Sequence, residues 1–325
     1  MHNVEVLGCG RVTGILIVTP VFNDGACLEF LFRDLGNAGI PCEVDVFVVD
    51  DGSTTDISLR SAAIPVAIGS VSVLRVGANV GHQRAIAIGL VEAVRLGNHD
   101  AIAVIDSDGE DQPADLVALL EALRSAPDSI VVAQRRSRTD SARFRAFYAM
   151  YRVLFRWLTG RRLDFGNFSV LPSAAAQRIV LMPELWNHYP AAIMRSRLAI
   201  TGVPIDRGHR YSGQSRMSFT ALVSHGLAGI ASFVDTAFTR LLVLASSLAA
   251  LFGVLVAGAF ILRVSIGVPI PGWAALGASV AAIALVQVLV GLVVVSFLTL
   301  SSRSSVSPPP ADFASGYVVK IDRIT

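Results

Sequence analysis

The stretch AVIDSDGEDQP (residues 103–113) changes abruptly from apolar residues to a cluster of carboxylates. Its apolar half continues a run from 101 to 105 that reads as a buried β-strand, and four acidic residues follow directly: Asp106, Asp108, Glu110 and Asp111. Like charges in a partly buried site repel one another strongly, and a cation bound among them offsets this repulsion. The stretch therefore predicts a cation site at the carboxyl end of a buried strand.

Strand-length runs rich in Val and Ile alternate with helix-length stretches along the first two thirds of the chain. The expected strands are 15–19, 46–49, 71–76, 101–105 and 130–133, and the helices between them include 27–36, 83–96 and 113–125. This alternation predicts an α/β domain with a mainly parallel sheet.

Polar residues gather where four of these strands end, in TPVFND (19–24), DDGSTTD (50–56), GANVGHQ (77–83) and DSDGED (106–111). Ligands of open α/β sheets bind outside the carboxyl ends of the strands, so the four clusters predict one site. Asp106 and Asp108, at alternate positions and with Glu110 close by, offer hard oxygen ligands suited to Mg²⁺ or Mn²⁺.

Several other classes of protein fit the sequence less well. No G-x-G-x-x-G follows the first strand and no P-loop motif occurs, which argues against the common nucleotide-binding folds. A receiver-like domain needs a lysine from a late strand, but the sole lysine is Lys320. The formal net charge of +2 gives no sign of the strongly basic surface that binds nucleic acid. The cysteines are Cys9, Cys27 and Cys42. Their odd number argues against a disulfide framework, and they lack the spacing of zinc ligands.

The last third of the chain is the most hydrophobic part of a sequence whose mean hydropathy is +0.60. Residues 241–262, between Arg240 and Arg263, are uncharged and would span about 33 Å as a helix. A second uncharged run covers 273–300. These runs predict a transmembrane hairpin rather than two buried helices. No signal peptide precedes the Arg-bearing N-terminal region, which places both flanks in the cytoplasm. The stretch 219–234 is expected to lie along the membrane surface, and the tail from 301 to be flexible.

The order of the motifs resembles the family 2 glycosyltransferases with a GT-A fold. FGNFSVLP (165–172) and RGHRYSGQSRMSF (207–219), followed by two membrane spans, are similar to polyprenyl-phosphate glycosyltransferases such as dolichol-phosphate mannose synthase and bactoprenol glucosyltransferase. The resemblance implies a GT-A domain over 1–213, a juxtamembrane amphipathic helix over 214–236, two transmembrane helices within 237–302 and a cytoplasmic tail over 303–325. It further implies a UDP- or GDP-linked sugar donor, a polyprenyl phosphate acceptor in the cytoplasmic membrane, Mg²⁺ or Mn²⁺ as cofactor, and inversion at the anomeric carbon. It is compatible with a homo-oligomer.

The resemblance also implies roles for particular residues at the donor site. The set expected to bind the nucleotide sugar is Pro20, Phe22, Asn23, Asp24, Asp50, Asp51, Gly52, Ser53, Asn79, Gly81, Asp106 and Ser107, and the metal ligands are Asp106, Asp108 and Glu110. Other interpretations stay open, because D-D-G-S residues also close turns. Likewise, Gly81, Ala85 and Gly89, spaced four apart, are typical of close helix packing.

The acceptor site is where this sequence departs from its relatives. Asn167 stands where many bacterial relatives carry Asp, and an Asn does not accept a proton at neutral pH. A phosphate acceptor is already ionised above its second pKa of about 6 and needs no base. Asn167 is therefore expected to orient the acceptor, unless another carboxylate such as Asp111 acts as a base. Arg135 is a candidate for the acceptor phosphate.

Basic residues near the membrane are expected to stabilise the leaving diphosphate. Arg210, Ser215 and Arg216 fit such a clamp, although a basic patch for anionic lipid headgroups is an alternative. The expected catalytic set is thus Asp106, Asp108, Asn167, Arg210 and Arg216. Processive polysaccharide synthases usually carry Q-x-x-R-W, but VLFRW (153–157) has Val153 at the first position. A catalytically inactive membrane scaffold is disfavoured by the intact carboxylates.

Overall fold

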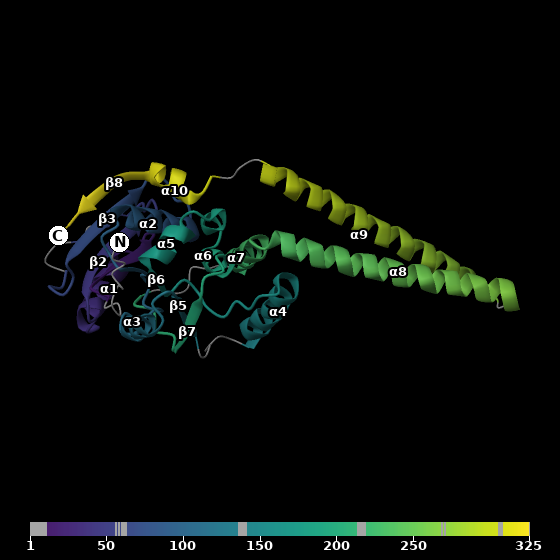
Figure 1. Cartoon of the computed structure of the whole chain (residues 1–325), viewed down its shortest axis with the longest axis horizontal. Helices are drawn as coiled ribbons and strands as arrows, with labels where there is room; N and C mark the ends of the chain where they lie inside the picture. Colours follow the sequence, from purple (N-terminus) through teal and green to yellow (C-terminus); the bar gives the residue numbers. More distant parts are fainter. Residues whose placement is uncertain are drawn as a thin grey trace, which may run out of the picture. The chain divides into compact units, whose positions relative to one another are not determined.

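The computed structural model describes residues 12–55, 57, 59, 64–135, 142–212, 219–267, 269, 271–304 and 308–324. The chain divides into two compact units (Figure 1). The first comprises Met1–Tyr151, Leu163–Ser232 and Pro308–Thr325, and the second comprises Arg152–Arg162 and Phe233–Ser307.

The first unit is built on a sheet that contains, among the described residues, eight strands in the order β7-β5-β6-β4-β1-β2-β3-β8. β1 is parallel to β2 and β4, β2 to β3, and β5 to β7. β6 runs antiparallel to β4 and β5, and β8 runs antiparallel to β3. The strands are β1 Gly14–Val21, β2 Glu43–Asp50, β3 Ser70–Val76, β4 Ala101–Val104, β5 Ile130–Arg135, β6 Ser169–Pro172, β7 Ile200–Ile205 and β8 Val318–Arg323. The predicted α/β domain with a mainly parallel sheet is confirmed.

Helices cover both faces of this sheet, and each face forms its own apolar core. Because side chains alternate along a strand, Leu16 and Val18 of β1 enter the core beneath α2, α5 and α6, whereas Ile15 and Ile17 enter the core beneath α1 and α3. All four side chains are fully buried. The helices of this unit are α1 Gly25–Asn37, α2 His82–Leu96, α3 Asp115–Ser125, α5 Ser173–Ile179, η2 Pro183–Trp186, α6 Tyr189–Arg195, α7 Phe219–Ala231, α10 Pro310–Phe313 and η3 Ala314–Tyr317. α4, Ala142–Thr159, spans the boundary between the units.

The small residues of α2 let this helix approach the sheet closely. A Cβ atom placed on Gly89 would lie 2.4 Å from Val18 Cγ1 and 2.8 Å from Val49 Cγ2. Ala85, one turn earlier, is fully buried. The packing interpretation of this stripe is therefore confirmed at Gly89.

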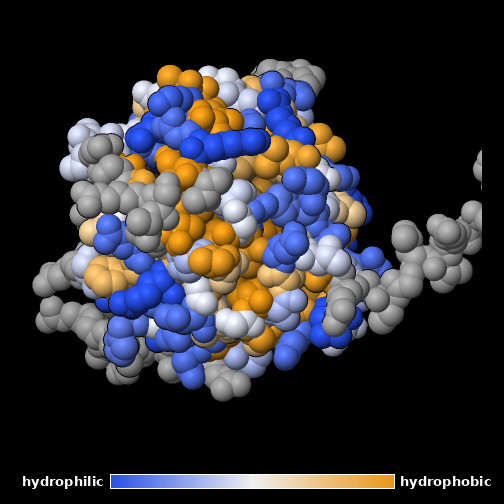
Figure 2. All heavy atoms as spheres, turned by 90° about the vertical axis from the view of Figure 1, so that its left-hand side faces the viewer, coloured by the Kyte–Doolittle hydropathy of each residue, from blue (hydrophilic) through white to orange (hydrophobic). Residues whose placement is uncertain are grey.

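The expectation of a flexible tail is wrong for residues 308–324. This segment forms α10, η3 and β8, and β8 extends the sheet by pairing with β3 (Figure 1). The Trp186 ring packs against the rings of Phe313 and Tyr317, with centroids 4.8 and 5.2 Å apart. The pairing with β8 provides hydrogen-bond partners for the backbone amides and carbonyls at the edge of β3. Figure 2 faces the side where β8 lies and shows hydrophobic residues among hydrophilic ones.

The second unit contains two long apolar helices in the described part of the chain, α8 (Val234–Ile266) and α9 (Gly272–Ser304). The membrane-span candidates within them are Val234–Ile266, with a hydropathy of 2.4, and Ala274–Val295, with a hydropathy of 2.7. Only 6% and 0% of their most apolar windows are buried. The two predicted apolar helices are thus present. The preceding amphipathic stretch forms α7 within the first unit.

Candidate active site

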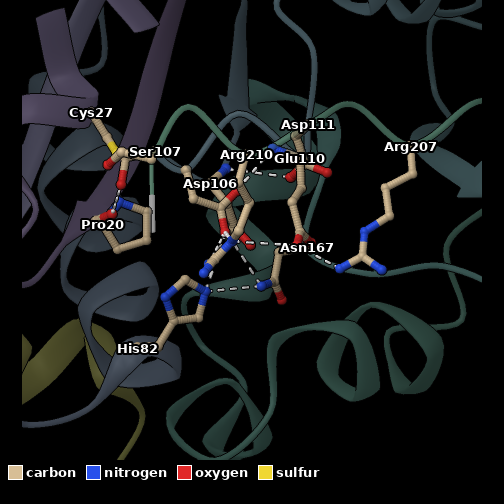
Figure 3. Close-up of polar contacts among 12 residues, drawn as sticks. Pro20, Cys27, His82, Asp106, Ser107, Glu110, Asp111, Asn167, Arg207 and Arg210 are labelled. Carbon is tan, nitrogen blue, oxygen red and sulfur yellow. Dashed lines mark hydrogen bonds and ion pairs between the residues drawn. The ribbon is translucent and has the colours of Figure 1, made fainter. Parts of the chain in front are cut away.

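The four polar clusters predicted from the sequence meet at one edge of the sheet. Their strands are parallel neighbours in the order β4-β1-β2-β3, so their carboxyl ends open on the same side. The Asn23 backbone amide donates to Ser53 Oγ (2.9 Å), which joins the first cluster to the second. Ser107 Oγ donates to the Pro20 carbonyl (3.1 Å), which joins the fourth cluster to the first (Figure 3).

The DDGS turn after β2 is held by its own carboxylates. Asp50 Oδ1 accepts from the Ser53 amide (2.9 Å), and the Asp51 carboxylate accepts from the amides of Val80 and Gly81 (2.7 and 3.0 Å). Gly52 has φ +69°, and a Cβ there would lie 2.6 Å from the backbone nitrogen of Asn79. Both the backbone conformation and the space therefore require glycine.

The other residues predicted to bind the donor surround this turn. Burial raises the pKa of Asp51, against the opposing hydrogen bonds from the amides after β3. Asn79 Nδ2 donates to the Asp51 carbonyl (3.1 Å). Asn23 Oδ1 accepts from the Thr54 amide (2.8 Å), while the Phe22 ring is 42% exposed. Asp24 immediately precedes α1. The structure brings the expected donor residues together, and their contact with a nucleotide stays a prediction.

Asp106, the first carboxylate after β4, faces a histidine and an amide. His82 Nε2 lies 3.2 Å from Asp106 Oδ1, and Asn167 Nδ2 donates to the same oxygen at 3.5 Å (Figure 3). Burial would raise the pKa of Asp106, but the charge and hydrogen bond of His82 outweigh it and hold that pKa low. Conversely, desolvation would lower the pKa of His82, but the charge of Asp106 raises it. Each side chain therefore favours the charged form of the other.

Residues 106–111, called here the carboxylate loop, lie beside the segment that follows β7. This segment supplies two arginines. The Gly208 amide donates to the Glu110 carbonyl and the Tyr211 amide to the Asp108 carbonyl, both at 2.9 Å. The Arg210 guanidinium donates to Asp108 Oδ2 through both Nε (3.2 Å) and Nη2. Arg207 Nη2 donates to Glu110 Oε1. The two arginines therefore neutralise part of the charge that the sequence concentrates here.

The ring of Tyr211 covers the turn within the carboxylate loop. Gly109 has φ +88°, and a Cβ there would lie 2.9 Å from this ring. Burial raises the pKa of Asp108, the nearby Asp106 charge adds to this rise, and Arg210 opposes it. The geometry of the loop thus depends on a glycine and on the segment that follows β7.

Asp111 is the most deeply buried of the four carboxylates in this cluster. Its side chain is only 2% exposed, Oδ1 accepts from Arg135 Nη2 at 3.0 Å, and Oδ2 accepts from the Asp106 amide at 3.4 Å. Burial and the charge of Asp106 raise its pKa to about 7, although Arg135 opposes the rise. A carboxylate so covered is poorly placed to take a proton from an acceptor. Arg135, predicted for the acceptor phosphate, also lies 3.7 Å from Glu110 Oε2.

Asp106 and Asp108 have the chemistry of a Mg²⁺ or Mn²⁺ site. Both side chains are partly exposed, at 25% and 18%. Burial raises the pKa of Asp108 most, and the negative charge of Asp106 adds a repulsion that a cation would relieve. Within the described residues, no three His, Cys, Asp or Glu side chains are grouped to hold a metal ion. Mg²⁺ is usually bound by one or two carboxylates together with substrate phosphates and water. Asp106 and Asp108 are two carboxylates of the kind such an ion needs, and metal binding by them and by Glu110 stays a prediction.

Sequence reasoning missed several functional candidates. His82 lies within the GANVGHQ cluster, and Arg207 is the first residue of RGHRYSGQSRMSF (207–219). Both could therefore have been identified from the sequence. Gln83 Nε2 donates to Asn167 Oδ1 (3.1 Å), and Gln83 Oε1 accepts from the Tyr189 amide (2.7 Å). Nothing local in the sequence indicates this bracing of Asn167. Ser215 and Arg216 lie outside the described residues.

These residues lie at the carboxyl edge of the parallel strands of a GT-A sheet. A family model described as "Glycosyl transferase family 2" matches residues 16–180, which are 165 of the 325 residues. The chain belongs to this family, and it is a glycosyltransferase that transfers a sugar from a nucleotide-sugar donor.

Two relatives resemble most of the chain. An uncharacterized glycosyltransferase of Synechocystis, sll0501, is 27% identical over 267 residues, which cover 80% of this chain and 82% of that one. The uncharacterized glycosyltransferase YkoT of Bacillus subtilis is 24% identical over 274 residues, covering 81% and 80%.

Among solved structures, one similar chain is glucosyl-3-phosphoglycerate synthase from Mycobacterium tuberculosis in complex with Mn²⁺, UDP-glucose and phosphoglyceric acid. It is 18% identical with a TM-score of 0.49, and the match covers 70% of this chain and 80% of that one.

Proposed function

We propose that this glycosyltransferase transfers its sugar to a polyprenyl phosphate in the cytoplasmic membrane, with Mg²⁺ or Mn²⁺ at Asp106 and Asp108. The observation that carries the proposal is the pair of apolar helices after the catalytic unit, whose most apolar windows are 6% and 0% buried. The core helix of a soluble protein would be covered, and a signal sequence would lie near the N-terminus. A membrane anchor of this kind suits an acceptor that is itself dissolved in the bilayer.

The position of β8 supports an even number of membrane crossings. β8 follows α9 in the chain, yet it pairs with β3 in the same sheet as β1 and β2. A strand of that sheet must lie on the same side of the membrane as the rest of the sheet. Two crossings by α8 and α9 satisfy this condition, and a single crossing does not. We place that side in the cytoplasm, where nucleotide sugars are made.

In the proposed reaction, the leaving diphosphate develops negative charge as the anomeric bond breaks. The bound cation would supply positive charge at the diphosphate oxygens. Asp106 and Asp108 would hold this ion, and the Arg210 guanidinium, already beside Asp108, would stabilise the leaving group by a charge present before the reaction begins. Ser215 and Arg216 are proposed to complete this clamp.

The acceptor phosphate would attack the anomeric carbon directly, which inverts the configuration. Because the phosphate oxygen is already ionised, no proton has to be removed before attack. This suits a site in which Asn167 is braced by Gln83 and lies beside Asp106, and in which Asp111 is buried against Arg135. Asn167 would then orient the acceptor, and Arg135 is proposed to add positive charge near its phosphate.

The test compares two acceptors that differ only in the phosphate. The full-length protein in lipid nanodiscs receives either a polyprenyl phosphate or the corresponding polyprenol, with a panel of UDP- and GDP-sugars and Mn²⁺. We expect one sugar to be transferred to the phosphate and none to the alcohol. Efficient glycosylation of the alcohol would show that a general base exists and would overturn the proposal. Addition of many sugars to one acceptor would favour a processive synthase.

A further inference from the structure

Charged side chains form a row across the carboxyl ends of β2 and β3 and the C-terminal strand β8. Asp50 of β2 is the register partner of Arg75 of β3, and Arg75 is the register partner of Lys320 of β8. Asp322 lies two residues beyond Lys320 on the same face of β8. Diagonal neighbours of this kind are within reach of a long side chain. Asp50 and the diagonal neighbour Asp322 therefore place a carboxylate on each side of Arg75, and Lys320 lies beside Asp322.

The Arg75 guanidinium bridges the two carboxylates of this row. Its Nη1 donates to Asp50 Oδ2 at 3.2 Å, and its Nε donates to Asp322 Oδ2 at 2.9 Å. Lys320 Nζ binds the other oxygen of Asp322 at 2.6 Å. Asp50 is only 5% exposed, whereas the Arg75 side chain is 34% exposed. A partly exposed arginine has many rotamers, so a second carboxylate on its far side restricts it to the one that reaches Asp50.

Asp50 in turn sets the position of the turn that follows β2. Its Oδ1 accepts from the Ser53 amide at 2.9 Å, and Ser53 Oγ accepts from the Asn23 amide at 2.9 Å. A buried carboxylate without its cation is costly unless it moves toward water. Such a movement would release the Ser53 amide and disturb the contact between the first and second polar clusters.

We infer that Arg75 and Asp322 are positioning residues for the donor nucleotide. Asp322 orients Arg75, and Arg75 fixes Asp50 and the turn at residues 50–53. The inference rests on the proposed donor role of that turn. It also gives the C-terminal strand a function in donor binding, because the chain beyond the apolar hairpin supplies the outer carboxylate of the row.

A purely structural role for β8 would have different consequences. In that case the Arg75–Asp322 pair would only help β8 to cover the edge of β3, and its loss would lower thermal stability without changing nucleotide affinity. The neighbouring Arg323 offers a matched control, because it is an exposed, charged residue of the same strand that follows Asp322 directly. Successive side chains of a strand point to opposite faces, so Arg323 does not face Arg75.

The test measures the affinity of UDP and of GDP, with Mn²⁺ present, for the full-length protein in nanodiscs by calorimetry. We expect Asp322→Asn to weaken binding of the preferred nucleotide about threefold to fivefold, which is the effect of a partly exposed ion pair. Arg75→Ala should weaken it at least tenfold, because Asp50 is left without its cation, and Arg75→Lys should restore part of the loss. Arg323→Gln should bind as the wild type does. Binding of Mn²⁺ alone should be the same in all variants.

Several results would overturn the inference, and they separate it from the proposed function. Wild-type affinity in Asp322→Asn, alongside weakened binding in Asp50→Asn, would refute the positioning role alone. Wild-type affinity in Asp50→Asn would refute the donor role of the turn and the inference together. Nucleotide binding that responds as expected, with no transfer to polyprenyl phosphate, would refute the proposed acceptor and leave the positioning role supported.

Discussion

Replacing Asp108 by Asn removes one negative charge from the proposed cation site with almost no change in shape. Asp108 Oδ2 accepts from Arg210 Nε at 3.2 Å, and Oδ1 accepts from the Glu110 amide at 2.9 Å. Opposite charges 3.2 Å apart attract by about 5 kcal/mol at an effective dielectric constant of about 20, before solvation is counted. The Asn variant loses this attraction together with one of two carboxylates for the cation.

We therefore expect Asp108→Asn to lower kcat/KM for sugar transfer by about 10²-fold or more, or at least about 2.7 kcal/mol of transition-state stabilisation. Transfer is measured as release of nucleoside diphosphate over a range of Mn²⁺ concentrations. EDTA should abolish wild-type activity, and Mg²⁺ or Mn²⁺ should restore it. The control is Asp128→Asn, an exposed carboxylate before β5, which should keep wild-type activity. Full activity of Asp108→Asn in the presence of chelator would refute the metal assignment.

Three further predictions concern the acceptor, the topology and stability. Asn167→Ala should lower the transfer rate about tenfold or less, because Asn167 orients an already ionised acceptor, and a loss of 10³-fold in the same assay would show a larger role. Reporters fused to the two termini should both be found in the cytoplasm, and a C-terminal reporter outside it would contradict the pairing of β8 with β3. Burial would raise the pKa of Asp45, but hydrogen bonds from Ser70 and His99 outweigh it and lower that pKa. The ionised form therefore stabilises the fold above about pH 4. Asp45→Asn should then reduce stability by about 1 kcal/mol at pH 7, and thermal melts should show the difference from the wild type shrinking as the pH falls through this lowered pKa. A difference that stays constant with pH would contradict the ionic contribution.

The meeting of the four polar clusters was predictable because each cluster directly follows an apolar strand in the sequence. Parallel strands place their carboxyl ends at one edge, so local patterns around Asp50, Asn79 and Asp106 were enough to predict their proximity. The partner of each carboxylate was not predictable in this way. Asp108 pairs with Arg210 and Asp111 with Arg135, and those pairs depend on how the segment after β7 and the end of β5 approach the loop.

The sequence by itself determined the α/β class, the place of the carboxylate site and the two apolar helices, because periodicity and long apolar runs are local properties. Only the tertiary structure decided the antiparallel insertion of β6, the pairing of β8 with β3 and the bridge from Arg75 to Asp322, which are 247 residues apart. Composition marked the tail after the hairpin as flexible, yet an open strand edge and an aromatic contact at Trp186 order it. Such pairing depends on which surfaces remain uncovered once the rest of the sheet has formed, and no local pattern in the sequence records that.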